Sequence, residues 1–389
     1  MSYISNRIVN RLNIHSVLHT AGFNLAGNFF IIFLLSHHFS AVSFFLYLPL
    51  ILMLRFALRP IVLYIAPRIG SRRTLYIGVC FFAAQYISLA WVDGIDGAFA
   101  LYCLLCALAD IFYWTPYHSI FSFLADDAHR GKQISAREAL NTIATVLAPL
   151  AGGLAIDYFG AKAAFSIGAV IELCSIIPLL CIPNIPIAHK RPHGAFNAVR
   201  EGACIFITDG WIAISFLYAW AVMLFNSTGS HYTKFGGAFA LAGLVASLAG
   251  LLIGKMIDAG HAQRTVIIGG LFCIGAIILK ASAGGDLTEK MGIMSICSLL
   301  AISYNPMLMT AIYRLAAKAP CTLRFIFVTE GSWDIGSTSC CLAIAGLLSC
   351  GAPIGWAVAM AIPVTLLQMV LLYKFYKQSM PARLVDLPQ

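Results

Sequence analysis

The chain consists of long apolar stretches separated by short polar segments. A helix that crosses the hydrocarbon core of a membrane needs about 20 predominantly apolar residues. Twelve stretches meet this requirement, and the glycines and prolines inside them are common in membrane helices. The stretches are residues 12–35, 41–66, 74–92, 97–124, 135–158, 163–183, 209–228, 235–258, 265–283, 291–317, 325–350 and 353–376. The pattern predicts an all-α polytopic membrane protein with twelve transmembrane helices.

The composition agrees with a membrane location. Of the 389 residues, 60% are hydrophobic and 11% are charged, whereas an average soluble domain is about half apolar and about one quarter charged. The net charge of +9 does not require a nucleic-acid partner, because membrane proteins concentrate Lys and Arg in their cytoplasmic loops. Residues 1–16 show no small-residue cleavage site after a short apolar core, so we expect the first stretch to remain as a membrane helix.

The distribution of cations along the chain indicates its orientation. With the N-terminus placed in the cytoplasm, 18 Lys and Arg residues fall in cytoplasmic segments, 4 fall outside and 3 fall within spans, which accounts for all 25. An excess of Lys and Arg on one side is typical of the cytoplasmic face. We therefore expect a multi-pass plasma-membrane protein with both termini in the cytoplasm, and a bacterial inner membrane is the favoured location.

The longest interruption between apolar stretches reads PNIPIAHKRPHGAFNAVREGACIFITDG and separates the sixth stretch from the seventh. It is rich in proline, basic, and then locally amphipathic, which is typical of a cytoplasmic linker that ends in a short surface helix. The predicted organisation is an N-terminal six-helix bundle (1–183), a cytoplasmic linker (184–208) and a C-terminal six-helix bundle (209–389).

Two loops occupy equivalent positions in the two halves. The loop after the second stretch reads LYIAPRIGSRRTLYIG, and the loop after the eighth reads LLIGKMIDAGHAQRTVIIGG. Each ends a helix, turns at glycine, adds cations and starts another helix. A third motif, APLAGGLAIDYFGAKAAF, joins the fifth and sixth stretches.

These motifs, with the twelve stretches and the central linker, resemble the major facilitator superfamily over nearly the whole chain. The second loop carries Gly254 and Asp258 at the positions of the signature, whereas the first has Pro67 where the family carries Asp. The resemblance implies two pseudo-symmetric six-helix bundles that give alternating access to a central site. It also implies that polar and aromatic residues on several helices line this site. The expected substrate-binding set is Asn24, Asn28, Arg55, Trp114, Tyr117, Trp220, Asn226, Tyr304 and Asn305.

Arg55 and Arg59 lie four residues apart on the second stretch and therefore on one helical face. Buried arginines are costly unless they are paired or hydrated. In the family fold the second helix neighbours the eleventh, and the rise per residue places Glu330 and Asp334 at matching depths. We predict that Arg59 pairs with Glu330 and that Arg55 pairs with Asp334. Two roles remain open for these pairs, a structural latch between the halves and an anion site or gate.

Further charges are expected at the cytoplasmic ends of the helices, where they would act as gates or latches. This set comprises Arg72, Arg137, Glu138, Lys255 and Asp258. Asp110 lies near the middle of the fourth stretch beside aromatic residues and is the first candidate for proton coupling, with cation contact and a structural hydrogen bond as alternatives. Glu172, in the middle of the sixth stretch, is the second proton-coupling candidate. His15 and His19 share one face of the first stretch, and helix packing is the favoured role for both.

The function that these features favour is secondary active transport of a small organic solute by alternating access, with proton coupling. The arginines favour an anionic solute and the aromatic residues favour an amphiphilic one. The chain lacks a GxxxxGK[ST] nucleotide loop and any Cys/His spacing typical of a metal site, so we expect no cofactor, no metal and no enzymatic activity. A receptor or sensor on a transporter fold and a membrane transferase are the alternatives. The expected partners are the solute, protons and the lipid bilayer, and the expected state is a monomer.

Overall fold

A computed structural model describes residues 7–37, 39–124, 130–187, 193–194, 199–229, 231–257, 262–301 and 304–379, and throughout these ranges the regular elements are helices. They are α1 (Arg7–Leu25), η2 (Gly27–Phe29), α2 (Phe30–Ser36), α3 (Ala41–Leu58), α4 (Pro60–Ile69), α5 (Ser71–Leu89), α6 (Gly97–Leu124), α7 (Arg130–Phe159), α8 (Ala161–Cys174), α9 (Ile176–Leu179), α10 (Arg200–Ala213), the π-helical η3 (Ile214–Tyr218), α11 (Ala219–Thr228), α12 (Tyr232–Ile257), α13 (Ala262–Ala281), α14 (Leu287–Ala301), α15 (Tyr304–Lys318), α16 (Thr322–Ser349), α17 (Ile354–Ala359) and α18 (Ala361–Ser379).

Most predicted stretches are helical in the structure, and several are interrupted. α3 gives way to α4 at Pro60, which occupies the first turn of α4, where its missing N–H is tolerated. By length and apolar composition, eight continuous spans qualify among the described residues, or nine if the bent pair α14 and α15 is counted as one. α16 is not among them; it carries Arg324, Glu330 and Asp334. The helix order agrees with twelve spans, and that number itself remains a prediction.

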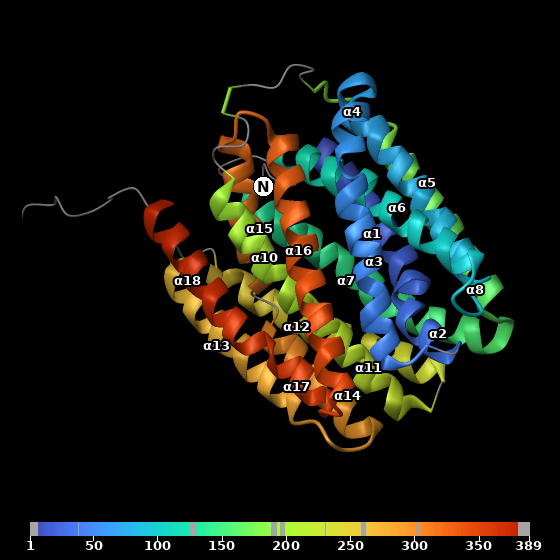
Figure 1. Cartoon of the computed structure of the whole chain (residues 1–389). Helices are drawn as coiled ribbons and strands as arrows, with labels where there is room; N and C mark the ends of the chain where they lie inside the picture. Colours follow the sequence, from blue (N-terminus) through green and yellow to red (C-terminus); the bar gives the residue numbers. More distant parts are fainter. Residues whose placement is uncertain are drawn as a thin grey trace, which may run out of the picture.

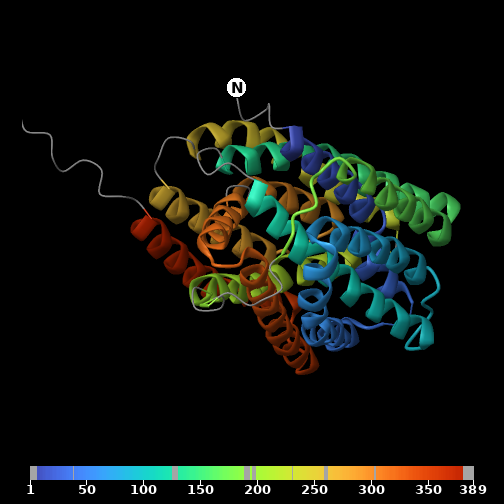
Figure 2. The same ribbon diagram turned by 90° about the horizontal axis from the view of Figure 1, so that it is seen from above.

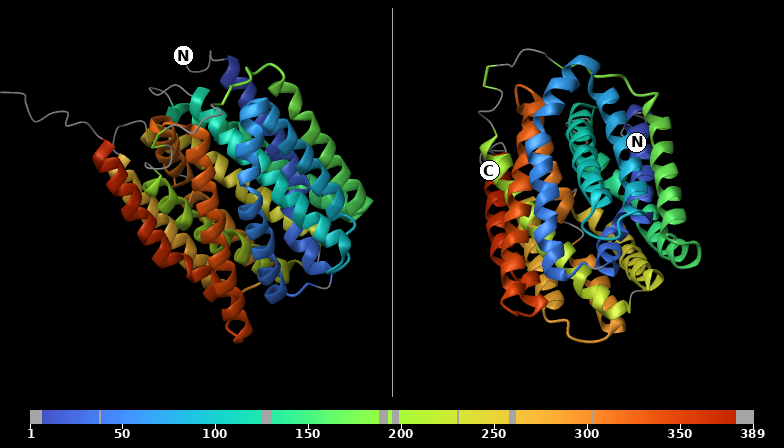
Figure 3. Two further views of the ribbon diagram at one scale, coloured as in Figure 1. Left: turned by 45° about the horizontal axis from the view of Figure 1, so that its top comes forward. Right: turned by 45° about the vertical axis from the view of Figure 1, so that its right-hand side comes forward.

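The helices form two groups that lie side by side (Figures 1 and 2). Within the first-half helices (α1–α9), α5 packs on α6 and α1 packs on α7 and α8; within the second-half helices (α10–α18), α10 packs on α16 and α13 packs on α14 and α18. The two groups meet chiefly through α7 against α12 and α3 against α16. The first turn of α1 and the last turn of α18 lie at the same end of the molecule (Figure 3).

The loop after α4 joins helices within the first half. The Asn184 side chain donates to the carbonyl of Ile69 (2.8 Å) and accepts from the backbone N–H of Arg72 (3.1 Å). The Arg72 guanidinium donates to the carbonyls of Leu180 (3.2 Å) and Ile182. Arg72 was predicted to act as a gate or latch; its contacts in this structure hold α5 to the segment after α9.

Glycines allow α7 and α12 to approach closely across the interface between the halves. A Cβ atom on Gly236 would overlap the carbonyl oxygen of Pro149, and one on Gly153 would overlap the carbonyl oxygen of Tyr232. Each glycine therefore faces the backbone of the opposite helix, which cannot move aside as a flexible side chain could. Small residues at such crossings are typical of membrane helices. In a membrane the hydrophobic effect does not drive helices together, so close backbone packing stabilises their association.

We predict that Gly236→Val destabilises the protein by about 1–3 kcal/mol, the usual cost of overpacking, because α12 must move away from α7. The measurement is the thermal unfolding midpoint of the purified protein in detergent. Gly275→Val on α13 is the matched control, since a Cβ at Gly275 meets open space. Equal midpoints for the two variants would contradict the prediction.

Candidate functional site: a charged pocket between the two halves

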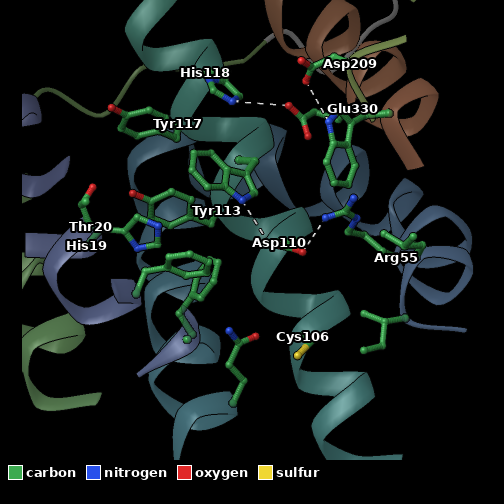
Figure 4. Close-up of a pocket in the computed structure, with 18 of the residues that line it drawn as sticks. His19, Thr20, Arg55, Cys106, Asp110, Tyr113, Tyr117, His118, Asp209 and Glu330 are labelled. Atoms are coloured by element: carbon green, nitrogen blue, oxygen red, sulfur yellow. Dashed lines mark hydrogen bonds and ion pairs between the residues drawn. The ribbon is translucent and has the colours of Figure 1, made fainter. Parts of the chain in front are cut away.

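A cavity of about 460 Å³ lies between the two groups of helices and is lined from both. α1, α3, α5, α6 and α7 contribute from the first half, and α10, η3, α15 and α16 contribute from the second. Sites of this size that accept small organic molecules are usually apolar with a few convergent polar groups. Here aromatic rings and ionisable side chains share the lining (Figure 4).

A network of arginines and carboxylates joins the halves at the pocket wall. Both Arg55 of α3 and Arg59, the residue that caps the end of this helix, form ion pairs with the fully buried Asp334 of α16. Arg55 Nη1 also donates to Asp110 Oδ2 on α6 (2.6 Å), and Arg59 Nη1 donates to Thr115 Oγ1 (3.3 Å). Three helices from two halves are therefore held by charge-assisted hydrogen bonds, which are stronger than neutral ones.

The predicted pair of Arg55 with Asp334 is confirmed. The predicted pair of Arg59 with Glu330 is wrong, because Arg59 reaches Asp334. Glu330 instead has His118 Nε2 at 3.5 Å from its Oε1. Depth along the helices identified the interacting elements, but it did not indicate that one carboxylate would accept both guanidinium groups.

Asp110 lies at the pocket wall, as the sequence predicted for a cavity residue. Its Oδ1 accepts from Trp114 Nε1 one turn along α6 (3.2 Å), while its Oδ2 accepts from Arg55. Its side chain is 23% exposed, in contrast to the fully buried Asp334. Asp110 is thus the carboxylate bound to Arg55 that a solute in the pocket can reach.

The second-half wall carries another indole held by a carboxylate. Trp333 Nε1 on α16 donates to Asp209 Oδ2 on α10 (3.0 Å), and the Arg55 guanidinium carbon lies 4.8 Å from the Trp333 ring centre. Asp209 and Glu330 lie with His118 at one end of the pocket view, while Arg55 and Asp110 lie near its middle (Figure 4). The sequence did not predict a role in the site for Asp209, Trp333 or His118.

Tyr313 of α15 joins the halves at one end of the pocket. His118 Nδ1 lies 2.7 Å from Tyr313 Oη, Ser122 Oγ donates to the Tyr313 carbonyl (3.2 Å), and Arg137 Nη1 donates to Tyr313 Oη (3.3 Å). Arg137 was predicted as a latch, and its contact with Tyr313 joins the first half to α15 of the second half.

Three other predicted latch groups cannot be placed. The side chains of Glu138 and Lys255, and the whole of Asp258, lie outside the described residues.

At the opposite end of the pocket, the helices of the two halves also meet. There α2 contacts α11, and the Phe30 ring lies 5.9 Å from the Tyr218 ring.

Glu172 lies inside the first half, fully buried on α8. His19 Nδ1 of α1 lies 2.9 Å from Glu172 Oε1, and the His19 ring stacks on Tyr113 at 3.9 Å between centroids. His19 also lines the pocket, on the side opposite Arg55 (Figure 4). The histidines were predicted to pack between helices; one of them also connects the buried acid Glu172 to the cavity.

Several predicted lining residues lie elsewhere. Arg55, Trp114, Tyr117 and Asn305 line the pocket, whereas the other five do not. Asn28 of η2 donates to Asn24 of α1 (3.2 Å), and neither side chain lines the pocket. Trp220 and Tyr304 are buried in the second half, and Asn226 is exposed.

Within the described residues, no three His, Cys, Asp or Glu side chains are placed to hold a metal ion.

The profile of the Major Facilitator Superfamily matches residues 104–329, more than half of the chain. The chain belongs to the Major Facilitator Superfamily. It is thus a multi-pass membrane transporter of this superfamily, a group that moves small-molecule substrates.

A solved structure shows the same superfamily fold. The crystal structure of the human organic anion transporter MFSD10 (TETRAN) is similar with a TM-score of 0.66 and 14% sequence identity, over 94% of this chain and 99% of that chain. At this identity the likeness establishes the fold alone. A comparison with curated protein sequences found no significant match.

Proposed function

We propose that this protein is a secondary active transporter that moves a small organic solute by alternating access and couples the movement to protons. One observation carries the proposal: the pocket lies between the two halves and its charged wall is built from both. Contacts between the halves occur at both ends of the pocket, at Tyr313 and at Phe30 with Tyr218. Breaking one set of contacts while the other persists would expose the pocket to one side of the membrane at a time.

The proposed organisation follows from this mechanism. Residues 1–183 and 209–389 form the two moving bundles, residues 184–208 connect them in the cytoplasm, and both termini lie on that side. The close glycine contacts between α7 and α12 support a crossing that persists while the ends open. The protein works as a monomer in the plasma membrane, because a single chain supplies both walls of the pocket.

The nature of the solute is constrained by both charge and aromatic surface. An anionic solute would have to compete with Asp110 and Asp334 for the Arg55 guanidinium, because both carboxylates already bind it. The aromatic lining, which includes Trp114 and Tyr117, supports an amphiphilic solute. MFSD10 is named as an organic anion transporter, which supports an anionic solute as the alternative. The flux experiment described below therefore includes anionic metabolites.

Proton coupling is assigned to Asp110 and Glu172. Asp110 is reached from the pocket and bonds to Arg55, so its protonation would weaken the contact between α6 and α3. Glu172 reaches the pocket through His19. Each acid thus connects a proton site to the pocket where the solute binds.

The decisive test is Asp110→Asn in reconstituted vesicles. We expect flux driven by a proton gradient to fall at least about tenfold, equivalent to about 1.4 kcal/mol in the barrier, while exchange of solute without a gradient continues. The measurement is uptake and efflux of a panel of anionic metabolites and cationic dyes. Asp93→Asn is the matched control, because Asp93 is exposed between α5 and α6. Unchanged gradient-driven flux in Asp110→Asn would contradict proton coupling at this residue.

A further inference from the structure

We infer that the pocket binds the positively charged group of an amphiphilic aromatic cation, and that Glu330 and Asp209 receive this group. The inference rests on the proposed transport function and names its substrate class. It follows from three separate features of the pocket: its balance of charge, the state of its hydrogen-bonding groups and its aromatic walls.

The first feature is an excess of carboxylates around the pocket. The arginines are Arg55, Arg59 and Arg137, and the carboxylates are Asp110, Asp209, Glu330 and Asp334. Arg55 and Arg59 bind Asp110 and Asp334, and Arg137 donates to Tyr313. The arginines therefore do not offer a vacant anion site. Arg59 and Arg55 also attract Glu330 electrostatically, but neither is close enough to it to form an ion pair.

The second feature concerns the partners of Glu330 and Asp209. Within the part of the chain that the structure describes, neither Glu330 nor Asp209 forms an ion pair with Lys or Arg. Glu330 lies 3.5 Å from a nitrogen of His118, whose other nitrogen contacts Tyr313. Asp209 accepts a hydrogen bond from the neutral indole of Trp333. Because an unmatched carboxylate in an apolar site is costly, a positively charged ligand would stabilise this end of the pocket.

The third feature is the chemistry of the aromatic wall. The indole N–H groups of Trp114 and Trp333 are already bound to Asp110 and Asp209, so a solute meets the ring carbons of these two lining residues. The Trp114 ring also stacks on His118, with 5.4 Å between the ring centroids. Ring faces attract cations and flat aromatic groups. The position of the Arg55 guanidinium 4.8 Å from the Trp333 ring centre shows that this wall already accommodates a planar cation. Aromatic walls beside unmatched carboxylates fit an aromatic cation better than an anion.

Two dyes with the same xanthene ring system and opposite charge test the inference. Tetramethylrosamine is a cation and fluorescein is an anion, and binding of each to the purified full chain in lipid nanodiscs is measured by fluorescence anisotropy. We expect the wild-type protein to bind tetramethylrosamine at least about tenfold more tightly than fluorescein. Glu330→Gln and Asp209→Asn should each weaken tetramethylrosamine binding at least about tenfold without weakening fluorescein binding. Glu289→Gln is the control, since Glu289 is exposed at the start of α14.

The outcomes separate this inference from the proposed function. Preferential binding of fluorescein to the wild-type protein would overturn the inference whether or not the variants fold. Unchanged tetramethylrosamine binding in both folded variants would overturn it as well. Vesicles that exchange anionic metabolites but not tetramethylrosamine would support transport and refute the cation site. Specific tetramethylrosamine binding without any solute flux would support the site and refute transport.

Discussion

Replacing Asp334 with Asn is expected to cost about 3–5 kcal/mol of stability, the range observed when one partner of a buried ion pair is removed. Asp334 is fully buried and accepts hydrogen bonds from both Arg55 and Arg59. An amide in its place carries no negative charge, so Arg59 would lose its ion pair and Arg55 would keep only the one with Asp110. Since α3 and α16 form one of the main contacts between the halves, the loss should also loosen their association.

The thermal unfolding midpoint and the yield of monodisperse protein measure the effect. Asp93→Asn serves as the exposed control, and Asp334→Asn with Arg59→Met tests the cause. If the cost arises from an unmatched guanidinium, the double variant should be more stable than Asp334→Asn alone, because residues in one network are coupled. A double variant that loses the sum of the two single costs would contradict this explanation.

The sequence was sufficient to predict the helical architecture and the helices that carry charge. Apolar length identified the helices, and helical depth brought Arg55 next to Asp334. The rotation of each helix about its axis could not be predicted in the same way. A membrane helix is apolar on its lipid-facing and protein-facing sides alike, so it lacks the polar face that orients a soluble helix. For this reason Asn24 and Asn28 were predicted to line the pocket, whereas neither side chain does.

Other contacts depend on neighbours that no local pattern specifies. Lys280, near the end of α13, is buried and its Nζ donates to the Phe216 carbonyl (3.1 Å). Phe216 belongs to the π-helical η3, a local departure from α-helix that often marks functional regions. The His19 pair with Glu172 required α1 and α8 to be packed together before it could be recognised. In both cases the sequence showed a polar residue within an apolar stretch. It did not show which residue of another helix would be its partner.

The pair of His19 and Glu172 gives the prediction that best separates a structural from a coupling role. Glu172→Leu should destabilise the protein by about 1–3 kcal/mol, because the buried His19 nitrogen loses its acceptor. Adding His19→Phe removes the unsatisfied donor and keeps an aromatic ring against Tyr113, so most of the stability should return.

Proton-driven flux is expected to behave differently from stability in these variants. If Glu172 exchanges protons with the pocket through His19, then Glu172→Leu and the double variant should both lose flux driven by a proton gradient at least about tenfold. Both should retain exchange of solute across vesicles without a gradient, because Arg55, Asp110 and Asp334 on the far wall are unchanged. Recovery of gradient-driven flux together with stability in the double variant would assign the pair to helix packing alone. Stability that returns without flux would make this pair part of the proton pathway.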